Sequence, residues 1–304
     1  MENIIEKIQK LKKERRAVIL AHNYQRPEVQ DVADFVGDSL GLSLQAASTD
    51  AEVIVFCGVH FMAETAKIFS PEKTVLLPDP DAGCPMADMI NGEQLRELKA
   101  KHPSAKVLCY VNTSAAVKAE CDLCCTSANA VTMAKEVLKG EPEIIFVPDQ
   151  YLAAYVAEQT GMKFIVWHGF CPTHAKILPE DIEREKALHP RAVVIVHPEC
   201  RPAVTHLADK VASTEGMCRY VQESAATEII VGTEVGIIHR MKKENPGKVF
   251  YPVSEQAVCP NMKRITLEKV LWSLQDKVHE VNPPVEIAKR AYDSIERMLN
   301  YRPK

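Results

Sequence analysis

Three cysteine–proline pairs recur at a nearly constant interval along this chain of 304 residues. Cys84, Cys171 and Cys259 are each followed by a proline, and intervals of 87 and 88 residues separate them. Proline is favoured at the first position of a helix, where its missing N–H is not needed, so each cysteine is expected immediately before a helix. The free N–H groups and the positive dipole at such a position stabilise a thiolate, which is the form of cysteine that binds metal. The sequence therefore predicts three metal ligands.

Three interpretations of these cysteines are open at this point. Structural zinc usually has four ligands, which are often gathered as close C-x-x-C pairs. An iron–sulfur cluster is commonly held by four cysteines, so three cysteines leave one iron open to bind a substrate as a Lewis acid. Three buried structural cysteines are the remaining interpretation, but it leaves their regular spacing unexplained. We therefore expect a [4Fe-4S] cluster held by Cys84, Cys171 and Cys259.

A second cysteine-rich segment contains Cys121, Cys124 and Cys125 in a C-x-x-C-C motif. Such a motif, taken alone, suggests metal or redox chemistry. It has no counterpart 87 or 88 residues away, so we interpret these three cysteines as structural. Of the remaining cysteines, Cys200 is expected at the exposed rim of the site and the others in the core.

Polar side chains follow three short runs of β-branched residues, 17–24, 106–113 and 192–199. The residues at the ends of these runs are His22, Tyr24, Tyr110, Asn112, His197 and Glu199. Ligands of open parallel sheets bind beyond the carboxyl ends of the strands, so these side chains are expected to face one site. Histidine and glutamate are common general acids and bases, and tyrosine can protonate a developing alkoxide. The two histidines, Tyr24 and Glu199 are therefore the predicted catalytic residues, and Asn112 can donate a hydrogen bond to an oxyanion.

Three hydroxyl residues recur in phase with the cysteines. Ser39, Ser127 and Thr214 are separated by 88 and 87 residues, and each is expected to open a helix. Serine and threonine cap helices well, and helix N-termini also bind phosphate or carboxylate groups, so both roles are predicted. His174 follows Cys171 by one helical turn and is expected to hydrogen-bond the substrate or the cluster.

The elements that position these residues follow one pattern, β-α-β-α-β, which occurs three times. This order predicts an α/β fold with parallel sheets, right-handed crossovers and helices on the faces of the sheets. We place three similar α/β repeat domains at 1–102, 103–188 and 189–270, with a C-terminal helical segment, 271–304, packed back on the body. A pseudo-threefold axis relating the repeats would bring the strand ends together in a central active site.

Composition excludes several classes of protein. Apolar residues make up 46% of the chain, charged residues make up 26%, and the net charge is −4, so no strong positive field favours nucleic acid. The sequence contains no run of about 18 apolar residues, so no membrane span is predicted. The first 16 residues pattern as an amphipathic helix and not as a signal peptide. A reducing, cytoplasmic location is therefore expected, and disulfides are not.

The motifs together resemble those of the A-type quinolinate synthases of de novo NAD biosynthesis, over nearly the whole chain. The matching segments are AHNYQ (21–25), VGDSLGLS (36–43), GVHFMAETAK (58–67), AGCPMADM (82–89), YVNTSAAVKAECD (110–122), TSANA (126–130), GFCPTHAK (169–176), VHPEC (196–200), ASTEGM (212–217) and VCPNMKR (258–264). The resemblance implies three α/β domains about a pseudo-threefold axis. It also implies the condensation of iminoaspartate with dihydroxyacetone phosphate, with loss of phosphate and water, to form quinolinate.

The resemblance implies a role for individual residues as well. The three cluster ligands of the family correspond to Cys84, Cys171 and Cys259, and a tyrosine implicated in proton transfer corresponds to Tyr24. Substrate-binding positions of the family correspond to His22, Ser39, Tyr110, Asn112, Ser127, His197, Glu199 and Thr214. Some members carry a C-terminal cysteine pair, which this chain lacks, so redox control through such a pair is not expected. Functional coupling to an L-aspartate oxidase is the expected partner relation.

Two other functions compete with this interpretation. One is another [4Fe-4S] hydro-lyase of the aconitase kind, which also uses an open iron and would dehydrate a hydroxy acid without making quinolinate. The other is a non-catalytic metal or redox-sensing module, which would have no need of the polar residues at the strand ends.

Overall fold

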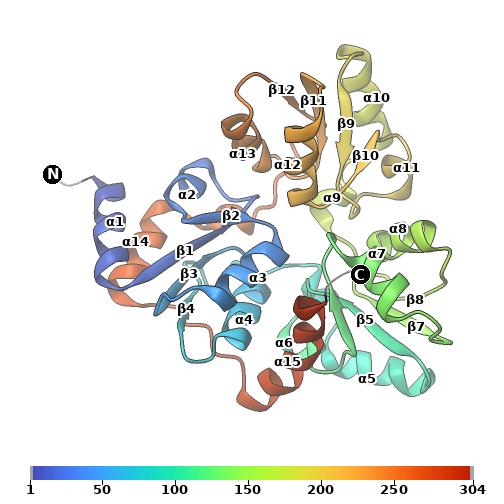
Figure 1. The fold of residues 1–304 in the computed structure, drawn as a ribbon, viewed down its shortest axis with the longest axis horizontal. Helices are drawn as coiled ribbons and strands as arrows, with labels where there is room; N and C mark the ends of the chain where they lie inside the picture. Colours follow the sequence, from blue (N-terminus) through green and yellow to red (C-terminus); the bar gives the residue numbers. More distant parts are fainter. Residues whose placement is uncertain (1–2, 302–304) are drawn as a thin grey trace.

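Three parallel sheets of four strands each form the framework of residues 3–301, the part of the chain that the computed structural model describes (Figure 1). The strand order is β2-β1-β3-β4 in the first unit, β6-β5-β7-β8 in the second and β10-β9-β11-β12 in the third. All pairings between these strands are parallel. Figure 1 shows the sheets in three lobes around a common centre. The predicted α/β class with three similar units is therefore confirmed, while the domain boundaries and the pseudo-threefold axis stay predictions.

The strands are short and similar from unit to unit. The first unit contains β1 (Ala17–His22), β2 (Phe35–Gly37), β3 (Val53–Cys57) and β4 (Thr74–Leu76). The second contains β5 (Lys106–Tyr110), β6 (Leu123–Cys125), β7 (Ile144–Val147) and β8 (Ile165–Val166). The third contains β9 (Val193–Val196), β10 (Lys210–Val211), β11 (Glu228–Gly232) and β12 (Val249–Pro252). The sequence pattern predicts three strands per unit. The edge strands β2, β6 and β10 are additional, because two or three residues are too few to show a period.

One aspartate in each unit holds the additional edge strand against the central strand. Asp34, Asp122 and Asp209 stand directly before β2, β6 and β10, at intervals of 88 and 87 residues. Their carboxylates accept the backbone N–H of Ile19, Val107 and Val194 at 2.8, 2.9 and 2.8 Å. The repeat is therefore visible in individual hydrogen bonds, and in each unit it fixes how the edge strand lies beside the strand that carries the predicted site residues.

Helices cover both faces of the sheets. Those of the first unit are α1 (Ile4–Glu14), α2 (Pro27–Val32), α3 (Ser39–Ser48), α4 (His60–Phe69), a 3₁₀ helix (Ala87–Met89) and α5 (Gly92–Lys101). Those of the second are α6 (Ala115–Lys118), α7 (Ala130–Thr132), which continues as a π-helical turn (Met133–Val137), α8 (Gln150–Thr160), α9 (Pro172–Ala175) and α10 (Pro179–Leu188). Those of the third are α11 (Pro202–Thr205), α12 (Thr214–Glu223), α13 (Ile237–Glu244) and a 3₁₀ helix (Met262–Arg264).

The last two helices pack back on the first two units. Helix α14 (Leu267–Asp276) lies against α1 and β3 of the first unit. Helix α15 (Val285–Asn300) lies against α6 and β6 of the second unit and also contacts α4 of the first. Its buried face is apolar and carries Ala291, Ile295 and Met298. The last helix therefore bridges two of the three units.

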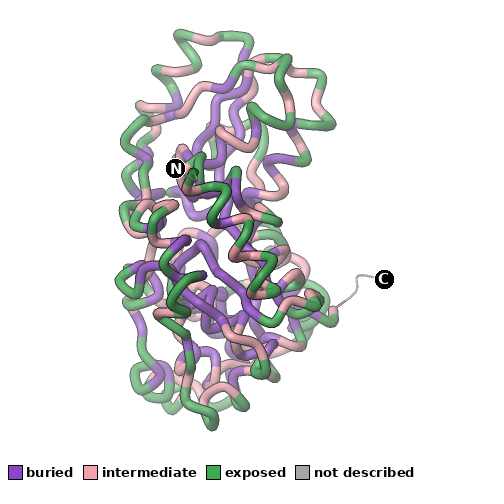
Figure 2. Tube along the Cα trace, turned by 90° about the vertical axis from the view of Figure 1, so that its left-hand side faces the viewer, coloured by how far each residue is buried: buried purple, intermediate pink, exposed green. Residues whose placement is uncertain are grey.

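The core consists mainly of the strands themselves. Figure 2 shows buried backbone running through the middle of the molecule and exposed backbone along the outer helices. The central strands are buried along nearly their whole length, as expected for parallel strands covered by helices on both faces. Among residues 3–301, no helix is long and apolar enough to cross a membrane.

Candidate active site

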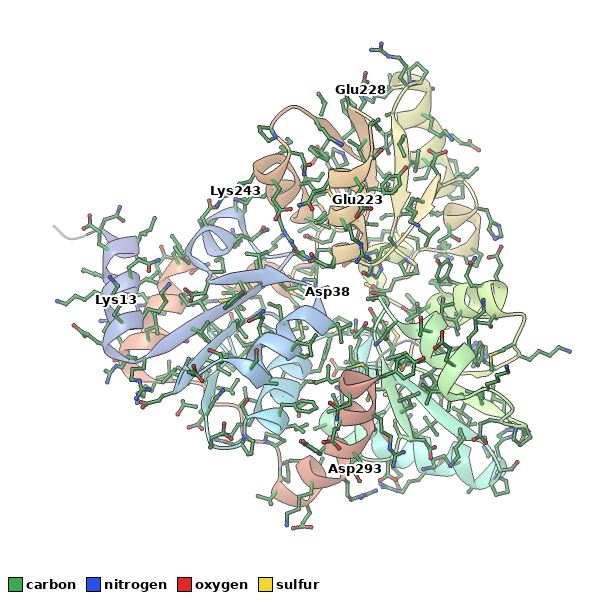
Figure 3. The ribbon with its side chains drawn as sticks, viewed as in Figure 1. Lys13, Asp38, Glu223, Glu228, Lys243 and Asp293 are labelled. Carbon is green, nitrogen blue, oxygen red and sulfur yellow. The ribbon has the colours of Figure 1, made fainter. Side chains whose placement is uncertain are left out.

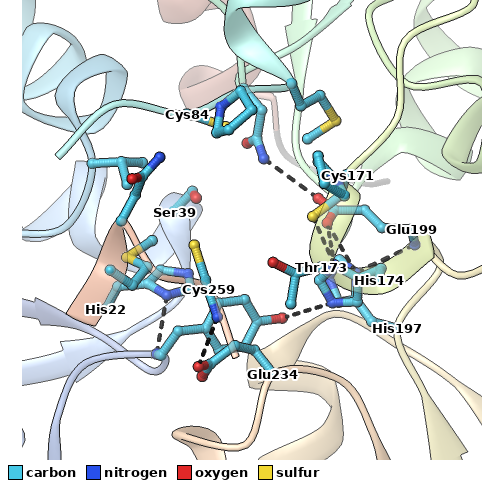
Figure 4. A pocket seen from close by; sticks show the side chains of 18 of the residues that line it. His22, Ser39, Cys84, Cys171, Thr173, His174, His197, Glu199, Glu234 and Cys259 are labelled. Carbon is cyan, nitrogen blue, oxygen red and sulfur yellow. Dashed lines mark hydrogen bonds and ion pairs between the residues drawn. The ribbon is translucent and has the colours of Figure 1, made fainter. Parts of the chain in front are cut away.

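One cavity, with about 160 Å³ of free volume, lies at the centre of the molecule (Figure 4). It is lined by residues that follow strands of all three sheets, as ligand sites of parallel sheets usually are. All the predicted site residues line it: His22, Tyr24, Ser39, Cys84, Tyr110, Asn112, Ser127, Cys171, His174, His197, Glu199, Thr214 and Cys259. Asp38 also lines it and lies near the centre in Figure 3, whereas Lys13, Lys243 and Asp293 lie at the periphery.

The three predicted metal ligands have the same local geometry. Each cysteine carbonyl accepts the backbone N–H of the fourth residue after it: Asp88 to Cys84 at 3.1 Å, Ala175 to Cys171 at 2.9 Å and Lys263 to Cys259 at 3.2 Å. Each thiol also accepts a backbone N–H from the third residue after it, namely Ala87, His174 and Met262. A helix does follow Cys171 directly, but the turns after the other two cysteines lead into 3₁₀ helices. The predicted backbone N–H groups are thus present at all three thiols, but the predicted helix directly follows only Cys171.

Burial acts against ionisation of these thiols in the absence of a metal. It raises the pKa of Cys84 to about 12 and also raises the pKa values of Cys171 and Cys259, although the backbone N–H groups oppose this shift. A buried thiol with this environment gains its thiolate only together with a cation, because metal binding releases the proton.

The spacing of the donor atoms distinguishes between kinds of metal group. Within residues 3–301, only Cys171, His174 and Glu199 place three ligand atoms within 4.8 Å of one another. The three cysteine sulfurs do not form such a close group, although Figure 4 shows all three thiols around the same open space. This arrangement suits a group with several metal atoms better than the tetrahedral zinc considered above.

A chain of hydrogen bonds joins Tyr24 of the first unit to groups of the other two units. The Tyr24 hydroxyl lies 2.6 Å from Oγ1 of Thr233, and this oxygen lies 2.8 Å from Nε2 of His174. Nδ1 of His174 lies 2.7 Å from the Glu199 carboxylate and 3.1 Å from the Cys171 sulfur. Thr233 is buried and was not among the predicted residues. It follows β11, which is the second strand that the sequence predicts in the third unit. Applying the strand-end rule to this strand as well as to the first would have found Thr233.

Glu199 is the central carboxylate of the cavity. Its Oε1 accepts a hydrogen bond from the Tyr110 hydroxyl, with an O–O distance of 2.5 Å, and another from Nδ2 of Asn112 at 3.4 Å. Burial raises the pKa of Glu199, but the adjacent His174 and the hydrogen bond from Tyr110 outweigh burial, so the pKa is lowered overall. Burial raises the pKa values of Tyr24 and Tyr110 far above the usual tyrosine value. At neutral pH the cavity therefore holds a carboxylate next to two protonated phenols.

Asn112 offers an acceptor to the cavity besides the donor that the sequence predicts. One N–H of its Nδ2 donates to Glu199, and its Oδ1 is buried without a hydrogen-bond partner in the described part of the chain. An unpartnered buried acceptor on the wall of a cavity calls for a donor from the ligand, because leaving it unpaired costs about 1–3 kcal/mol. The second N–H of the amide stays available for the predicted bond to an oxyanion, which remains a prediction.

The two histidines at equivalent strand ends have the same tautomer. Burial lowers the pKa of His22 and of His197 to about 3, so both rings are neutral at neutral pH. Nδ1 of His22 accepts the backbone N–H of Tyr24 at 3.1 Å, and Nδ1 of His197 accepts that of Glu199 at 3.3 Å. The proton of each neutral ring is therefore on Nε2, and His197 donates it to the Ser127 hydroxyl oxygen at 3.2 Å.

The predicted capping role of the three hydroxyls is wrong. Ser39 and Thr214 are the first residues of α3 and α12, but the caps are the residues before them: Asp38 accepts the N–H of Gly41 at 2.8 Å, and Ser213 accepts that of Gly216 at 3.2 Å. Ser127 lies in a turn ahead of α7 and does not open a helix. A cap needs an extended backbone, which only the preceding residues have, so the three hydroxyls remain available to the cavity.

A buried ion pair supports the backbone of the third cysteine. Glu234 is fully buried, and its carboxylate accepts the N–H of Cys259 at 3.2 Å and the N–H of Gly236 at 2.7 Å. Nζ of Lys263 lies 2.8 Å from the same carboxylate. Glu234 also lines the cavity. Like Thr233, it follows β11, and the sequence analysis considered only residues that follow the first strand of each unit.

The remaining cysteines lie away from this cavity. Cys124 and Cys125 are buried in β6, and Cys121 is half-buried beside them. Cys200 is fully buried and its thiol faces the carbonyl of Gly232, so the expectation of an exposed position at the rim is wrong. The turn that follows β9 folds Cys200 back under the sheet, because Cys200 N–H bonds the carbonyl of His197.

Comparison with known proteins finds one family over nearly the whole chain. The family described as quinolinate synthetase A protein matches residues 6–300. A quinolinate synthase of Dehalococcoides mccartyi is 61% identical over 298 residues, which cover 98% of each chain. Quinolinate synthase 1 of Methanosarcina acetivorans is 56% identical over 302 residues and 99% of each chain, and a quinolinate synthase of Thermodesulfovibrio yellowstonii is 55% identical over 298 residues and 97% of each chain. The chain therefore belongs to the quinolinate synthase family of enzymes.

Proposed function

We propose that this enzyme condenses iminoaspartate with dihydroxyacetone phosphate and, with loss of phosphate and water, forms quinolinate. The observation that carries the proposal is the single central cavity, in which one thiol from each unit lies beside a buried network of acid–base groups. Relatives at 55–61% identity carry the name quinolinate synthase.

We further propose that Cys84, Cys171 and Cys259 hold a [4Fe-4S] cluster. The donor set fits such a group, because it consists of three thiols that share one cavity, accept backbone N–H groups and do not form a close single-ion group. When bound, a cluster with three protein ligands supplies an open iron that acts as a Lewis acid.

The acid–base roles follow from which atoms carry protons. The Tyr24 hydroxyl is protonated and is hydrogen-bonded to Oγ1 of Thr233, so it can give a proton to a leaving hydroxyl. The hydrogen bonds from Tyr24 through Thr233 to His174 then provide a path by which Tyr24 can be protonated again. The Glu199 carboxylate is ionised and lies 2.7 Å from His174, so it can accept a proton from a substrate carbon or nitrogen. His22 and His197, which are neutral, can donate a hydrogen bond through Nε2.

The binding roles follow from the unused hydrogen-bonding groups of the cavity. The residues that we assign to binding are His22, Ser39, Tyr110, Asn112, Ser127, His174, His197, Glu199 and Thr214. Hydroxyls near helix starts suit carboxylate and phosphate groups. The Ser127 hydroxyl oxygen already accepts a hydrogen bond from His197, so the Ser127 hydroxyl can itself donate a hydrogen bond to a substrate anion. Asn112, with a free oxygen, accepts from a substrate hydroxyl or amine.

The chemistry of the first substrate suggests a partner and a location. Iminoaspartate is an imine that water hydrolyses, so we propose functional coupling to an L-aspartate oxidase that produces it. We propose a reducing, cytoplasmic location, because Cys84, Cys171 and Cys259 must stay reduced to hold the proposed cluster. We propose no nucleic-acid or membrane partner.

An anaerobic assay tests the proposed function directly. The purified protein, with its iron reconstituted, receives iminoaspartate and dihydroxyacetone phosphate, and quinolinate and phosphate are quantified. Equal release of quinolinate and phosphate supports the proposal. Dehydration of a hydroxy acid without quinolinate would instead support a hydro-lyase of the aconitase kind.

A further inference from the structure

A fully buried amide lies directly behind one of the cavity hydroxyls. Asn23 stands between His22 and Tyr24 in the turn after β1, but it does not line the cavity. Its Nδ2 donates to Oγ1 of Thr214 at 2.9 Å, and Thr214 does line the cavity. The contact joins the first unit to the third, and neither the spacing of the sequence motifs nor the roles proposed above require it.

Arg240 fixes which way round this amide lies. Nη1 of Arg240 donates to Oδ1 of Asn23 at 3.0 Å. A guanidinium has five donors and no acceptor, so the atom of Asn23 that faces it must be the amide oxygen. The amide nitrogen therefore faces Thr214, and the hydrogen bond between these two residues runs in one direction only.

The direction of that bond determines where the Thr214 proton points. A hydroxyl carries one hydrogen and accepts through its lone pairs. Because Oγ1 of Thr214 accepts from Asn23, its hydrogen is not used in this contact. In the described part of the chain the Thr214 hydroxyl makes no other side-chain hydrogen bond. The one acceptor left for its proton is whatever occupies the cavity.

The charge of Arg240 is not what reaches the cavity. The guanidinium binds both oxygens of Glu215 at 2.7 and 3.1 Å, and its Nε binds Glu244 at 2.7 Å. Two carboxylates therefore neutralise it locally, and 15% of its side chain is still exposed. Arg240 acts on Thr214 through the orientation of Asn23 rather than through a long-range field.

We propose that Arg240 and Asn23 form a one-way donor relay that points the Thr214 hydroxyl proton into the cavity, making Thr214 a dedicated donor to an anionic oxygen of the substrate. This inference rests on the proposed function and adds Asn23 and Arg240 as positioning residues. The relay favours a carboxylate or phosphate oxygen at Thr214 and disfavours an ammonium or hydroxyl donor there, because two donors would then face each other.

Asn23→Asp is the sharpest test because it keeps the shape of the side chain and reverses the relay. The carboxylate accepts from Arg240 as before, but it also accepts the Thr214 hydroxyl proton, which then points away from the cavity. A lost hydrogen bond to a charged group weakens binding roughly ten- to hundredfold. We expect KM for one of the two substrates to rise by that factor, with kcat changed much less. The melting temperature should fall, because Glu215 and Glu244 already neutralise Arg240 and the new carboxylate is buried, so KM is measured on the fraction that remains folded.

The experiment compares four anaerobically purified proteins: wild type, Asn23→Asp, Thr214→Val and the double variant. The relay requires Thr214→Val to raise KM for the same substrate as Asn23→Asp, and the double variant to be no worse than the worse single variant. If Asn23→Asp raises KM further in the Thr214→Val background, the added negative charge repels the substrate and the relay is wrong. An unchanged KM in Asn23→Asp overturns it as well. Thr214→Ser, which keeps the hydroxyl, should retain the wild-type KM.

Two additions keep the test decisive. If Asn23→Asp does not fold, Arg240→Met is the substitute variant, because without Arg240 the side-chain amide of Asn23 can flip. A smaller rise of the same KM is then expected, and an unchanged KM contradicts the relay. Calorimetric binding of quinolinate, a dicarboxylate, to the same variants reports on the relay without turnover. Absence of quinolinate formation by the wild type would refute the proposed function. Unweakened quinolinate binding by Asn23→Asp, with an active wild type, would refute only the relay.

Discussion

The wall of the cavity and the buried interior away from it contain the same kinds of side chain. Cys171 lines the cavity, while Cys124 is buried in β6 with its thiol 3.5 Å from the Ser294 hydroxyl. Thr214 lines the cavity, while its neighbour Ser213 caps α12. The two layers, wall and interior, differ in how the protein itself uses such groups. Cys124 and Ser213 are paired with other groups of the protein. On the wall, the Oδ1 of Asn112 and the proton of Thr214 are left over, and those are groups that a ligand can engage.

The largest expected difference between the two layers concerns the cluster. Replacing Cys84, Cys171 or Cys259 by alanine should abolish cluster binding and quinolinate formation, because each removes one of three ligands. Replacing Cys124 by alanine should leave both intact. Iron and sulfide analysis of anaerobically purified protein, with the visible absorption spectrum, measures the outcome. Zinc in the wild type, or loss of iron in Cys124→Ala alone, contradicts the assignment.

A smaller but still large effect is expected at the acid–base groups of the wall. Glu199→Gln and Tyr24→Phe preserve shape and remove a proton-transfer group, so kcat should fall by about 10²–10⁴-fold. Iron content and melting temperature should stay near those of the wild type, which separates chemistry from folding. Wild-type turnover in either variant would leave that residue with a structural role only.

Thr233 lies between the two layers and should show an intermediate effect. Thr233→Val removes the oxygen that joins Tyr24 to His174, and losing such a bond should lower kcat by about tenfold. Thr233→Ser retains the hydroxyl and should recover most of the rate. Equal rates in the valine and serine variants would show that methyl packing, and not the hydrogen bond, is what matters at this position.

The smallest effect is expected one residue away from the wall. Ser213→Ala removes the cap of α12 and should lower stability by about 0.5–2 kcal/mol, with both KM values unchanged. Thermal unfolding and steady-state kinetics on the same preparation check this against Thr214→Val, for which the reverse pattern is expected. A raised KM in Ser213→Ala would mean that capping and ligand binding are not separable here.

The sequence predicts the wall of the cavity well because the wall is repeated. Residues such as Cys84 and His22 have counterparts 87 or 88 residues further along, and parallel strands deliver equivalent residues to equivalent places. Two of the residues that the sequence missed, Thr233 and Asn23, act between units. Thr233 meets Tyr24 across 209 positions and Asn23 meets Thr214 across 191, and neither pair is repeated in the other units. No spacing rule reveals a contact that occurs once.

The capping error has a different origin. Asp38, Thr126 and Ser213 recur at the same intervals as the hydroxyl residues that follow them, so spacing alone cannot decide which row caps the helices. The backbone decides it, because Asp38 and Ser213 are extended and accept N–H groups from the first turn. The edge strands were missed because they are only two or three residues long.

The placement of one proposed cluster ligand in each unit would link assembly of the cofactor to assembly of the chain. A group held by Cys84, Cys171 and Cys259 binds only when all three sheets have folded and come together. By mass action, its binding free energy then stabilises the contacts between the units and not any one sheet. Removing it should loosen the way the three lobes pack while their internal hydrogen-bond ladders persist. Iron supply would thereby set how much of the protein is rigid, as well as how much of it is active.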